Sequence, residues 1–150
     1  MRSVPTLPRL LGLAGLLPQL ASLIVAFLGP DEWAVLARSF AALYAALIFT
    51  FLGGMWWGIA AAAPAAERRG GLRWIWFAAV MPSLLAAGAL AGWLSGTWPI
   101  EPALVTLGAG LLMALGVDAR ITPLSPRWWM RLRAPLSILL GAATIAIAFA

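Results

Sequence analysis

Five long apolar runs without a charged residue constrain the fold of this chain more than any other feature. They cover about residues 10–28, 40–63, 74–94, 102–117 and 134–150. A helix needs about 20 apolar residues to cross a bilayer core, and only helices or closed barrels satisfy their backbone there. The runs lack the two-residue alternation of barrel strands. They predict an all-α fold, with residues 1–150 forming one transmembrane domain of five helices.

The composition supports this class and narrows the chemistry. Only 10% of the residues are charged, whereas a soluble domain carries about 25%. The chain has no Cys and no His, so it lacks thiolate ligands, the commonest general base and the commonest metal ligand. We therefore predict a protein that is not an enzyme, with no catalytic residue, no metal site and no cofactor.

The arginines predict the orientation. All ten basic residues are Arg, and nine of them lie in the three segments that alternate on one side of a five-span bundle. Those segments are the N-terminal stretch and the second and fourth connections, whereas the opposite side has only Arg38. By the positive-inside rule the N-terminus is cytoplasmic and the C-terminus lies outside. We assign the net charge of +5 to topology and to anionic lipid headgroups, and not to nucleic acid.

Small residues recur every four positions along the second predicted helix, in what we call the small-residue stripe. Its members are Ala42, Ala46, Thr50, Gly54, Gly58 and Ala62. A similar series on the fourth helix comprises Thr106, Gly110 and Ala114 and leads to Asp118. Small residues let helices approach closely in lipid, so we expect these two helices to pack through these faces and Gly58→Leu to disrupt folding or assembly.

The stretch FLGGMWWG at residues 51–58 leaves a second interpretation open. Trp57 flanks the small-residue stripe and would wall a ligand or lipid groove together with Gly54 and Gly58. Trp56 is rotated by about 200° from Gly54 at 3.6 residues per turn, so we expect it to point to the opposite side.

Asp118 ends the fourth predicted helix, close to several arginines. The simplest interpretation is an ion pair with Arg120 that fixes the loop. A proton relay is the alternative, but it requires ionisable groups at membrane depth, and the five predicted spans contain no charged residue.

The segment before the fifth span predicts a short interfacial helix. Ser125 followed by Pro126 is typical of a helix start. Arg127 and Arg131 then share one face, as expected for an amphipathic helix lying at the membrane surface. The residues expected to contact anionic lipid headgroups at the cytoplasmic face are Arg127, Trp128, Arg131 and Arg133.

Several of these motifs together resemble the domain-of-unknown-function 3429 family, whose eukaryotic relatives are similar to transmembrane protein 69. They are LGLAGLLP at residues 11–18, FLGGMWWG at 51–58, MPSLL at 81–85, VDAR at 117–120 and WWMRLR at 128–133. The resemblance implies a small multi-pass protein of the bacterial inner membrane, with mitochondrial inner-membrane relatives and no settled activity. In that family a His or another polar residue often adjoins the tryptophan, at the place that Trp56 takes here.

Three functional hypotheses follow. The first is a non-catalytic accessory or scaffold subunit that packs against other membrane protein subunits, such as those of an energy-transducing complex. The second is a protein that binds or carries lipids or small hydrophobic molecules in the groove at Gly54, Trp57 and Gly58. The third, a membrane-embedded enzyme, would have only Asp118, Glu67, Glu101 and the arginines for its chemistry.

Overall fold

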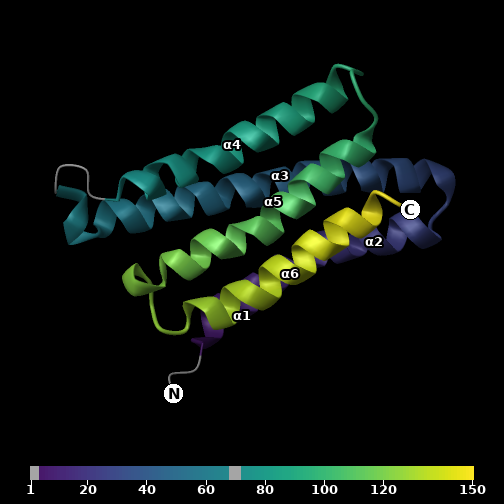
Figure 1. Ribbon diagram of the computed structural model, residues 1–150. Coiled ribbons are helices and arrows are strands. Elements are labelled where there is room, and N and C mark those ends of the chain that lie inside the picture. Colours follow the sequence, from purple (N-terminus) through teal and green to yellow (C-terminus); the bar gives the residue numbers. More distant parts are fainter. Residues whose placement is uncertain (1–3, 68–71) are drawn as a thin grey trace.

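The computed structural model describes residues 4–67 and 72–150, and every regular element in these ranges is helical (Figure 1). The α-helices are α1 (Thr6–Ala14), α2 (Leu17–Leu28), α3 (Asp31–Ala62), α4 (Arg73–Leu94), α5 (Ile100–Arg120) and α6 (Trp129–Ile147). Two short 3-10 helices, η1 (Pro64–Glu67) and η2 (Thr122–Leu124), follow α3 and α5.

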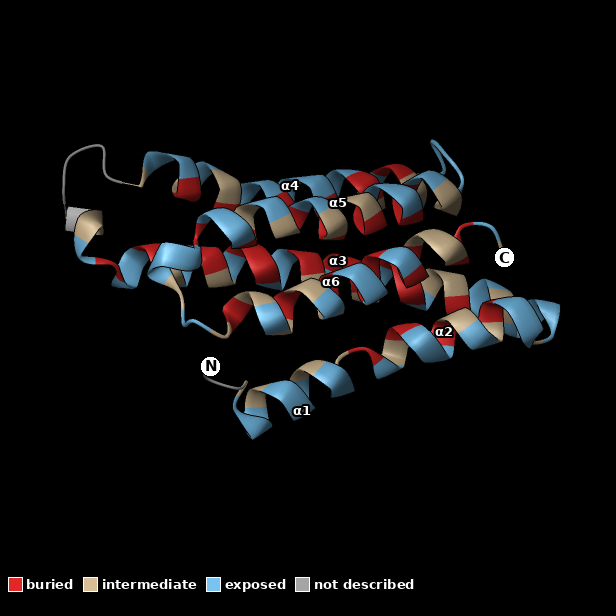
Figure 2. Ribbon diagram, turned by 60° about the horizontal axis from the view of Figure 1, so that its bottom comes forward, coloured by how far each residue is buried: buried red, intermediate tan, exposed pale blue. Residues whose placement is uncertain are grey.

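Five helical segments in the described ranges are long and apolar enough to cross a membrane, which confirms the predicted all-α bundle of five spans. They are Thr6–Leu28, Asp31–Ala62, Arg73–Leu94, Ile100–Arg120 and Trp129–Ile147. The two termini lie at opposite ends of the bundle (Figures 1 and 2), as an odd number of spans requires. The direction of the chain across the membrane stays a prediction.

The helices extend beyond the apolar runs that predicted them. The clearest case is α3, which begins at Asp31 instead of residue 40. Pro30 precedes this helix, and Asp31 and Glu32 occupy its first turn, where acidic side chains interact favourably with the helix dipole. An apolar run marks only the part of a helix that crosses lipid, so its polar first turns escape a hydropathy pattern.

The first span is broken into α1 and α2 at Gly15 and Leu16. Pro18 lies at the start of α2, and a proline has no N–H to donate and clashes with the carbonyl four residues before it. Tyr44 of α3 donates its hydroxyl to the carbonyl oxygen of Gly15 at 2.6 Å, which satisfies a backbone group at the break. Figure 2 shows α1 turned away from α3 at its N-terminal end.

Helix α3 is the centre of the bundle, since it contacts α2, α4, α5 and α6. Alanines dominate its buried face in the first half, with Ala41, Ala42 and Ala45 fully buried. Figure 2 shows buried residues recurring along α3. Such small side chains let helix backbones approach closely, which is how helices pack in lipid.

Glycines support this close packing, but at positions other than those of the small-residue stripe. A Cβ atom on Gly53 of α3 would collide with the carbonyl oxygen of Ala79 on α4. Gly108 of α5 and Gly141 of α6 face each other, and a Cβ on either would lie 2.8 or 2.9 Å from the carbonyl oxygen of the other. These glycines therefore set the spacing of α3 to α4 and of α5 to α6.

The prediction that the small-residue stripe packs against the fourth helix of the same chain is wrong for most of its length. Ala42 and Ala46 are buried, whereas Thr50, Gly54, Gly58 and Ala62 are exposed. No atom would lie within 4 Å of a Cβ on Gly54 or Gly58. Positions four apart advance by about 40° in a helix of 3.6 residues per turn, so a stripe of six positions turns from the buried face to the outer one.

The series of small residues on α5 is mostly buried, as expected for a packing face. Thr106 is exposed, but Gly110, Ala114 and Asp118 are buried. Gly110 packs against Phe49 of α3, whose ring would lie 2.7 Å from a Cβ at that glycine. The partner of α5 on α3 is therefore the face of Phe49 and not the face of Gly54.

The predicted short interfacial helix does not form as a separate element. Residues 125–128 are a turn, and Trp129 already begins α6, which continues without interruption to Ile147. Pro135 lies inside α6, where it cannot donate to the carbonyl of Arg131, and the helix continues through it. The segment that carries Arg131 and Arg133 is thus the first part of the fifth span.

Candidate functional site

The one charged pair buried among the described residues joins the end of α5 to the start of α6. Asp118 is fully buried, and the Nε atom of Arg133 lies 3.0 Å from its Oδ2 atom. The predicted ion pair of Asp118 with Arg120 is wrong, because Arg120 is exposed on the other side of α5. The turn through η2 places the first turns of α6 beside the last turn of α5. The carboxylate of Asp118 therefore binds Arg133, which follows it by 15 residues in the sequence.

Two tryptophans complete the surroundings of the carboxylate. The indole Nε1 atoms of Trp56 on α3 and Trp129 on α6 donate to Asp118 Oδ1 at 3.0 and 3.3 Å. Asp118 therefore accepts hydrogen bonds from two neighbouring helices, and α3, α5 and α6 are joined at one point. Buried charges are tolerated when they are paired and hydrogen-bonded in this way.

Trp56 and Trp57 point to different sides of α3, as expected, but the buried side is the one that carries Trp56. Trp56 is 2% exposed and points into the bundle, whereas the Trp57 side chain is 50% exposed. Trp57 lies edge-on to Trp76 of α4, with ring centroids 4.8 Å apart. What was wrong is the face assumed to be packed: the prediction took Gly54 as the packed position, whereas Gly53 is the glycine that contacts a neighbouring helix.

Arg133 also binds Ser137 on the next turn of α6. Its Nη2 atom donates to Ser137 Oγ at 3.1 Å, and both side chains are buried. Among the residues that the structure describes, none offers the Nη1 atom of this guanidinium a hydrogen-bond acceptor. Arg133 was expected at the lipid headgroups; it is instead a buried residue, because Asp118 and Ser137 hold it inside the bundle.

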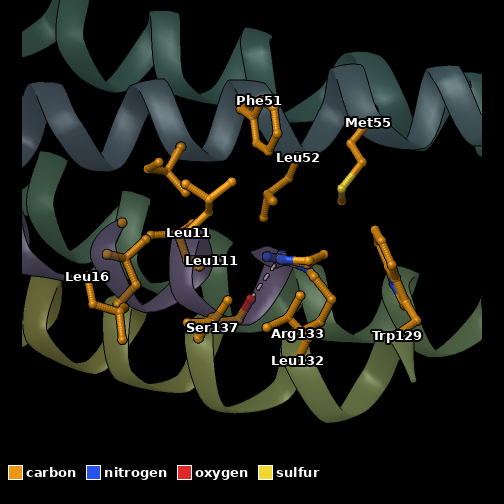
Figure 3. A pocket seen from close by; sticks show the side chains of 16 residues that line it. Leu11, Leu16, Phe51, Leu52, Met55, Leu111, Trp129, Leu132, Arg133 and Ser137 are labelled. Atoms are coloured by element: carbon orange, nitrogen blue, oxygen red, sulfur yellow. Dashed lines mark hydrogen bonds between the residues drawn. The ribbon is translucent and has the colours of Figure 1, made fainter. Parts of the chain in front are cut away.

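A pocket of about 340 Å³ lies directly beside Arg133 and Ser137 (Figure 3). It lies between α1, α3 and α6, and most of its wall is aliphatic. Lining residues include Leu11, Leu16, Leu52, Met55, Leu132 and Leu136. Its volume falls within the range of about 300–1,000 Å³ that is typical of small-molecule sites. The guanidinium, the serine hydroxyl and the indole of Trp129 are the polar groups at its wall.

The pocket opens to the outer surface of the bundle between α1 and α3. Leu11 of α1 and Phe51 of α3 line it and yet are 64% and 65% exposed. The break between α1 and α2 contributes to this opening, because α1 contacts the other helices only sparsely, chiefly at α6. Gly12 and Gly15 also line the pocket and add no side chain to fill it. The opening is apolar, as a route from lipid would be.

The predicted groove formed by Gly54, Trp57 and Gly58 is not the pocket described above. None of these three residues lines it. Gly58 instead borders an open hollow at the end of α3, together with Ala62, Pro64 and Pro123, and neither Gly54 nor Trp57 takes part in that hollow. The three residues share one face of α3, but that face is exposed and no atom lies within 4 Å of a Cβ on either glycine, so they do not enclose a common site.

The remaining predicted headgroup residues lie at the surface or close to it. Arg127 and Arg131 are exposed, and Trp128 is half-buried, with its ring tilted against that of Trp129. Their contact with anionic lipids stays a prediction. No group of three or more His, Cys, Asp or Glu side chains within residues 4–67 and 72–150 is arranged to hold a metal ion.

Trp56, Trp129 and Ser137 belong to this site and were not singled out as site residues from the sequence. The signal that would have revealed Trp56 is the spacing of large apolar residues along α3. Phe49, Leu52 and Trp56 follow one another at intervals of three and four, and all three are buried. Arg133 and Ser137, four residues apart on α6, similarly share one face.

Comparison with known proteins places the chain by family alone. No curated protein matches it, and no solved structure matches it. A family profile described as "Protein of unknown function (DUF3429)" matches residues 4–149, which is nearly the whole chain. This five-span helical protein, with its buried Asp118–Arg133 pair, therefore belongs to the DUF3429 family.

Proposed function

We propose that this protein binds a small, largely apolar molecule, a lipid or another hydrophobic compound, in the pocket between α1, α3 and α6. The observation that carries the proposal is the pocket of about 340 Å³ with aliphatic walls and a single guanidinium–hydroxyl pair, Arg133 and Ser137. Small-molecule sites have this character: they are mostly apolar and contain a few polar groups that orient the ligand.

The buried ion pair supports a binding role, because a pair that served only to stabilise the bundle would be an inefficient choice. Transferring Asp118 and Arg133 from water into the bundle carries a desolvation penalty that well-packed apolar residues would avoid. The opening between Leu11 and Phe51 supports the same role. A molecule dissolved in lipid would enter sideways through it, without crossing a polar surface.

Retention of a ligand through purification tests this proposal. We expect native mass spectrometry of the protein in mild detergent to find a bound hydrophobic molecule in stoichiometric amount. Leu136→Trp should abolish retention, since Leu136 is half-buried and lines the pocket. Leu139→Trp is the matched control on α6, because Leu139 is exposed and does not line the pocket. Equal retention by all three proteins, or by none, would contradict the proposal.

A second candidate function is the accessory or scaffold role, and one observation favours it. The outer face of α3 presents Thr50, Gly54, Gly58 and Ala62, with no atom of this chain packed on the two glycines. A helix of another membrane subunit would approach α3 closely along this face. An energy-transducing complex of the bacterial inner membrane is the kind of assembly that we propose for it.

Gly58→Leu distinguishes this second function from a role in folding. Since a side chain at Gly58 meets nothing within 4 Å, we now expect the variant to fold, contrary to the expectation from sequence that the bundle itself would suffer. It should lose a subunit that co-purifies stoichiometrically with the unaltered protein in mild detergent. A variant that keeps that subunit, or an unaltered protein that migrates as a free monomer, would exclude the accessory role.

A further inference from the structure

The charge of Arg133 is already balanced inside the protein, and this determines which head group the pocket accepts. We infer that the pocket selects an uncharged molecule with a carbonyl-type hydrogen-bond acceptor, such as a ketone or an ester, and discriminates against a carboxylate. The inference rests on the proposed binding function and names the class of molecule that the site takes.

The guanidinium has donors left for a ligand. Of its five N–H groups, one at Nε binds Asp118 and one at Nη2 binds Ser137. No described residue supplies an acceptor for Nη1. The hydroxyl of Ser137 accepts from Arg133 and keeps its own hydrogen to donate. Figure 3 shows both side chains at the wall of the pocket, facing its interior.

Asp118 makes this donor site electrically neutral. Its carboxylate is fully buried and lies 3.0 Å from the guanidinium, so the pair carries no net charge. A ligand carboxylate at Nη1 would pay the cost of leaving water and would also lie near the charge of Asp118, in surroundings that screen charges weakly. A carbonyl oxygen would gain a hydrogen bond from a charged donor without either penalty.

The acceptor must sit at one end of a small apolar body. The pocket volume of about 340 Å³ is near the lower end of the range for small-molecule sites, and the wall away from Arg133 and Ser137 is aliphatic. A single chain or a small ring system with one carbonyl group fits this pattern. A diacyl phospholipid would have to leave most of its volume outside the pocket.

Matched ligands of equal chain length test the inference. Methyl decanoate, decanoate and decane would be titrated into the full-length protein in one detergent, at a pH at which decanoate is ionised, with calorimetric detection. We expect methyl decanoate to bind at least about tenfold more tightly than either of the others. A diacyl phospholipid added as a competitor should not displace it. Displacement at similar concentration, or equal or tighter binding of decanoate, would overturn the inference.

Charge variants provide the decisive comparison. Asp118→Asn leaves Arg133 unbalanced and should reverse the preference, so that decanoate binds more tightly than the ester. Ser137→Ala keeps the ion pair and should weaken ester binding several-fold without reversing the preference. If Asp118→Asn does not fold, Asp118→Asn/Arg133→Met serves instead, and its preference for the ester over decane should be several-fold weaker, because only the Ser137 hydroxyl is left to donate. An unchanged preference for the ester in Asp118→Asn or in Asp118→Asn/Arg133→Met would overturn the inference. If the unaltered protein binds none of the three ligands and purifies with no hydrophobic molecule, the proposed function itself fails.

Discussion

Asp118 shows how much one residue organises in this bundle. Its carboxylate receives hydrogen bonds from Arg133, Trp56 and Trp129, which belong to two different helices. A buried carboxylate that loses one of these partners keeps its desolvation cost without the compensating bond. Substitutions around Asp118 should therefore affect stability strongly, whereas substitutions of nearby exposed residues should not.

Removing the partner of Asp118 is the first prediction at this scale. Arg133→Met leaves a buried, unpaired carboxylate and should lower the free energy of unfolding by about 3–5 kcal/mol. Adding Asp118→Asn removes the orphaned charge and keeps an acceptor for the two indoles, so part of the loss should be recovered. Unfolding in a denaturing-detergent titration would measure both. Arg120→Met is the control, since Arg120 is exposed; a loss as large as that of Arg133→Met would contradict the assigned pair.

The adjacent tryptophans give the second prediction. Trp56→Phe retains most of the apolar volume but removes the donor to Asp118, so it should cost about 1.5–3 kcal/mol, as for a hydrogen bond to a charged group. Trp57→Phe changes a half-exposed ring without a hydrogen-bonding role and should cost far less. Thermal unfolding of the two variants in one detergent compares them directly. The reverse order would mean that the assigned directions of the two indoles are wrong.

At the scale of the elements, the sequence predicted that α3 is a helix but not which of its faces is buried. The existence of five helices follows from five charge-free runs, and these runs need no knowledge of packing. Which face of α3 is buried depends on contacts with four other helices, and α3 is apolar on nearly every side. The pattern of small residues every four positions could not reveal that face, because it drifts around the helix.

The same limit applies to the candidate site. That Asp118 pairs with an arginine was predictable from its neighbours, but the choice of Arg133 over Arg120 depends on where the turn at η2 places α6. Arg133 was assigned to the surface because arginine is seldom buried. The pocket was not predictable at all, since it arises from the splayed position of α1.

Two neighbouring glycines test the orientation of α3, as the third prediction. Gly53→Ala would place a methyl group against the carbonyl oxygen of Ala79 and should destabilise the protein by about 1–3 kcal/mol, as overpacking does. Gly54→Ala meets no atom within 4 Å and should stabilise α3 by about 0.5–1 kcal/mol, because alanine is the better helix former. Thermal unfolding would detect both shifts. If Gly54→Ala lowered the stability and Gly53→Ala did not, α3 would be rotated from the position described.

For the whole molecule, the arrangement of charge gives the fourth prediction. The start of α1, the start of α4 and the turn between α5 and α6 lie at one end of the bundle (Figure 1). Most of the arginines belong to the segments at these places in the sequence, so we expect that end in the cytoplasm. The chain has no Cys, which makes single introduced cysteines specific probes. In intact cells an impermeant maleimide should label Thr97→Cys, in the turn between α4 and α5, but not Thr122→Cys in η2. The opposite labelling pattern would mean that the bundle is inserted the other way.

The pocket beside Arg133 is the central feature of the molecule, and a crystal structure of the protein purified in mild detergent tests it most directly. Binding of a small hydrophobic molecule predicts continuous non-protein density between α1, α3 and α6, with one end within hydrogen-bonding distance of Arg133 Nη1 or Ser137 Oγ. A structure in which α1 packs onto α3 and side chains fill this space would contradict that account.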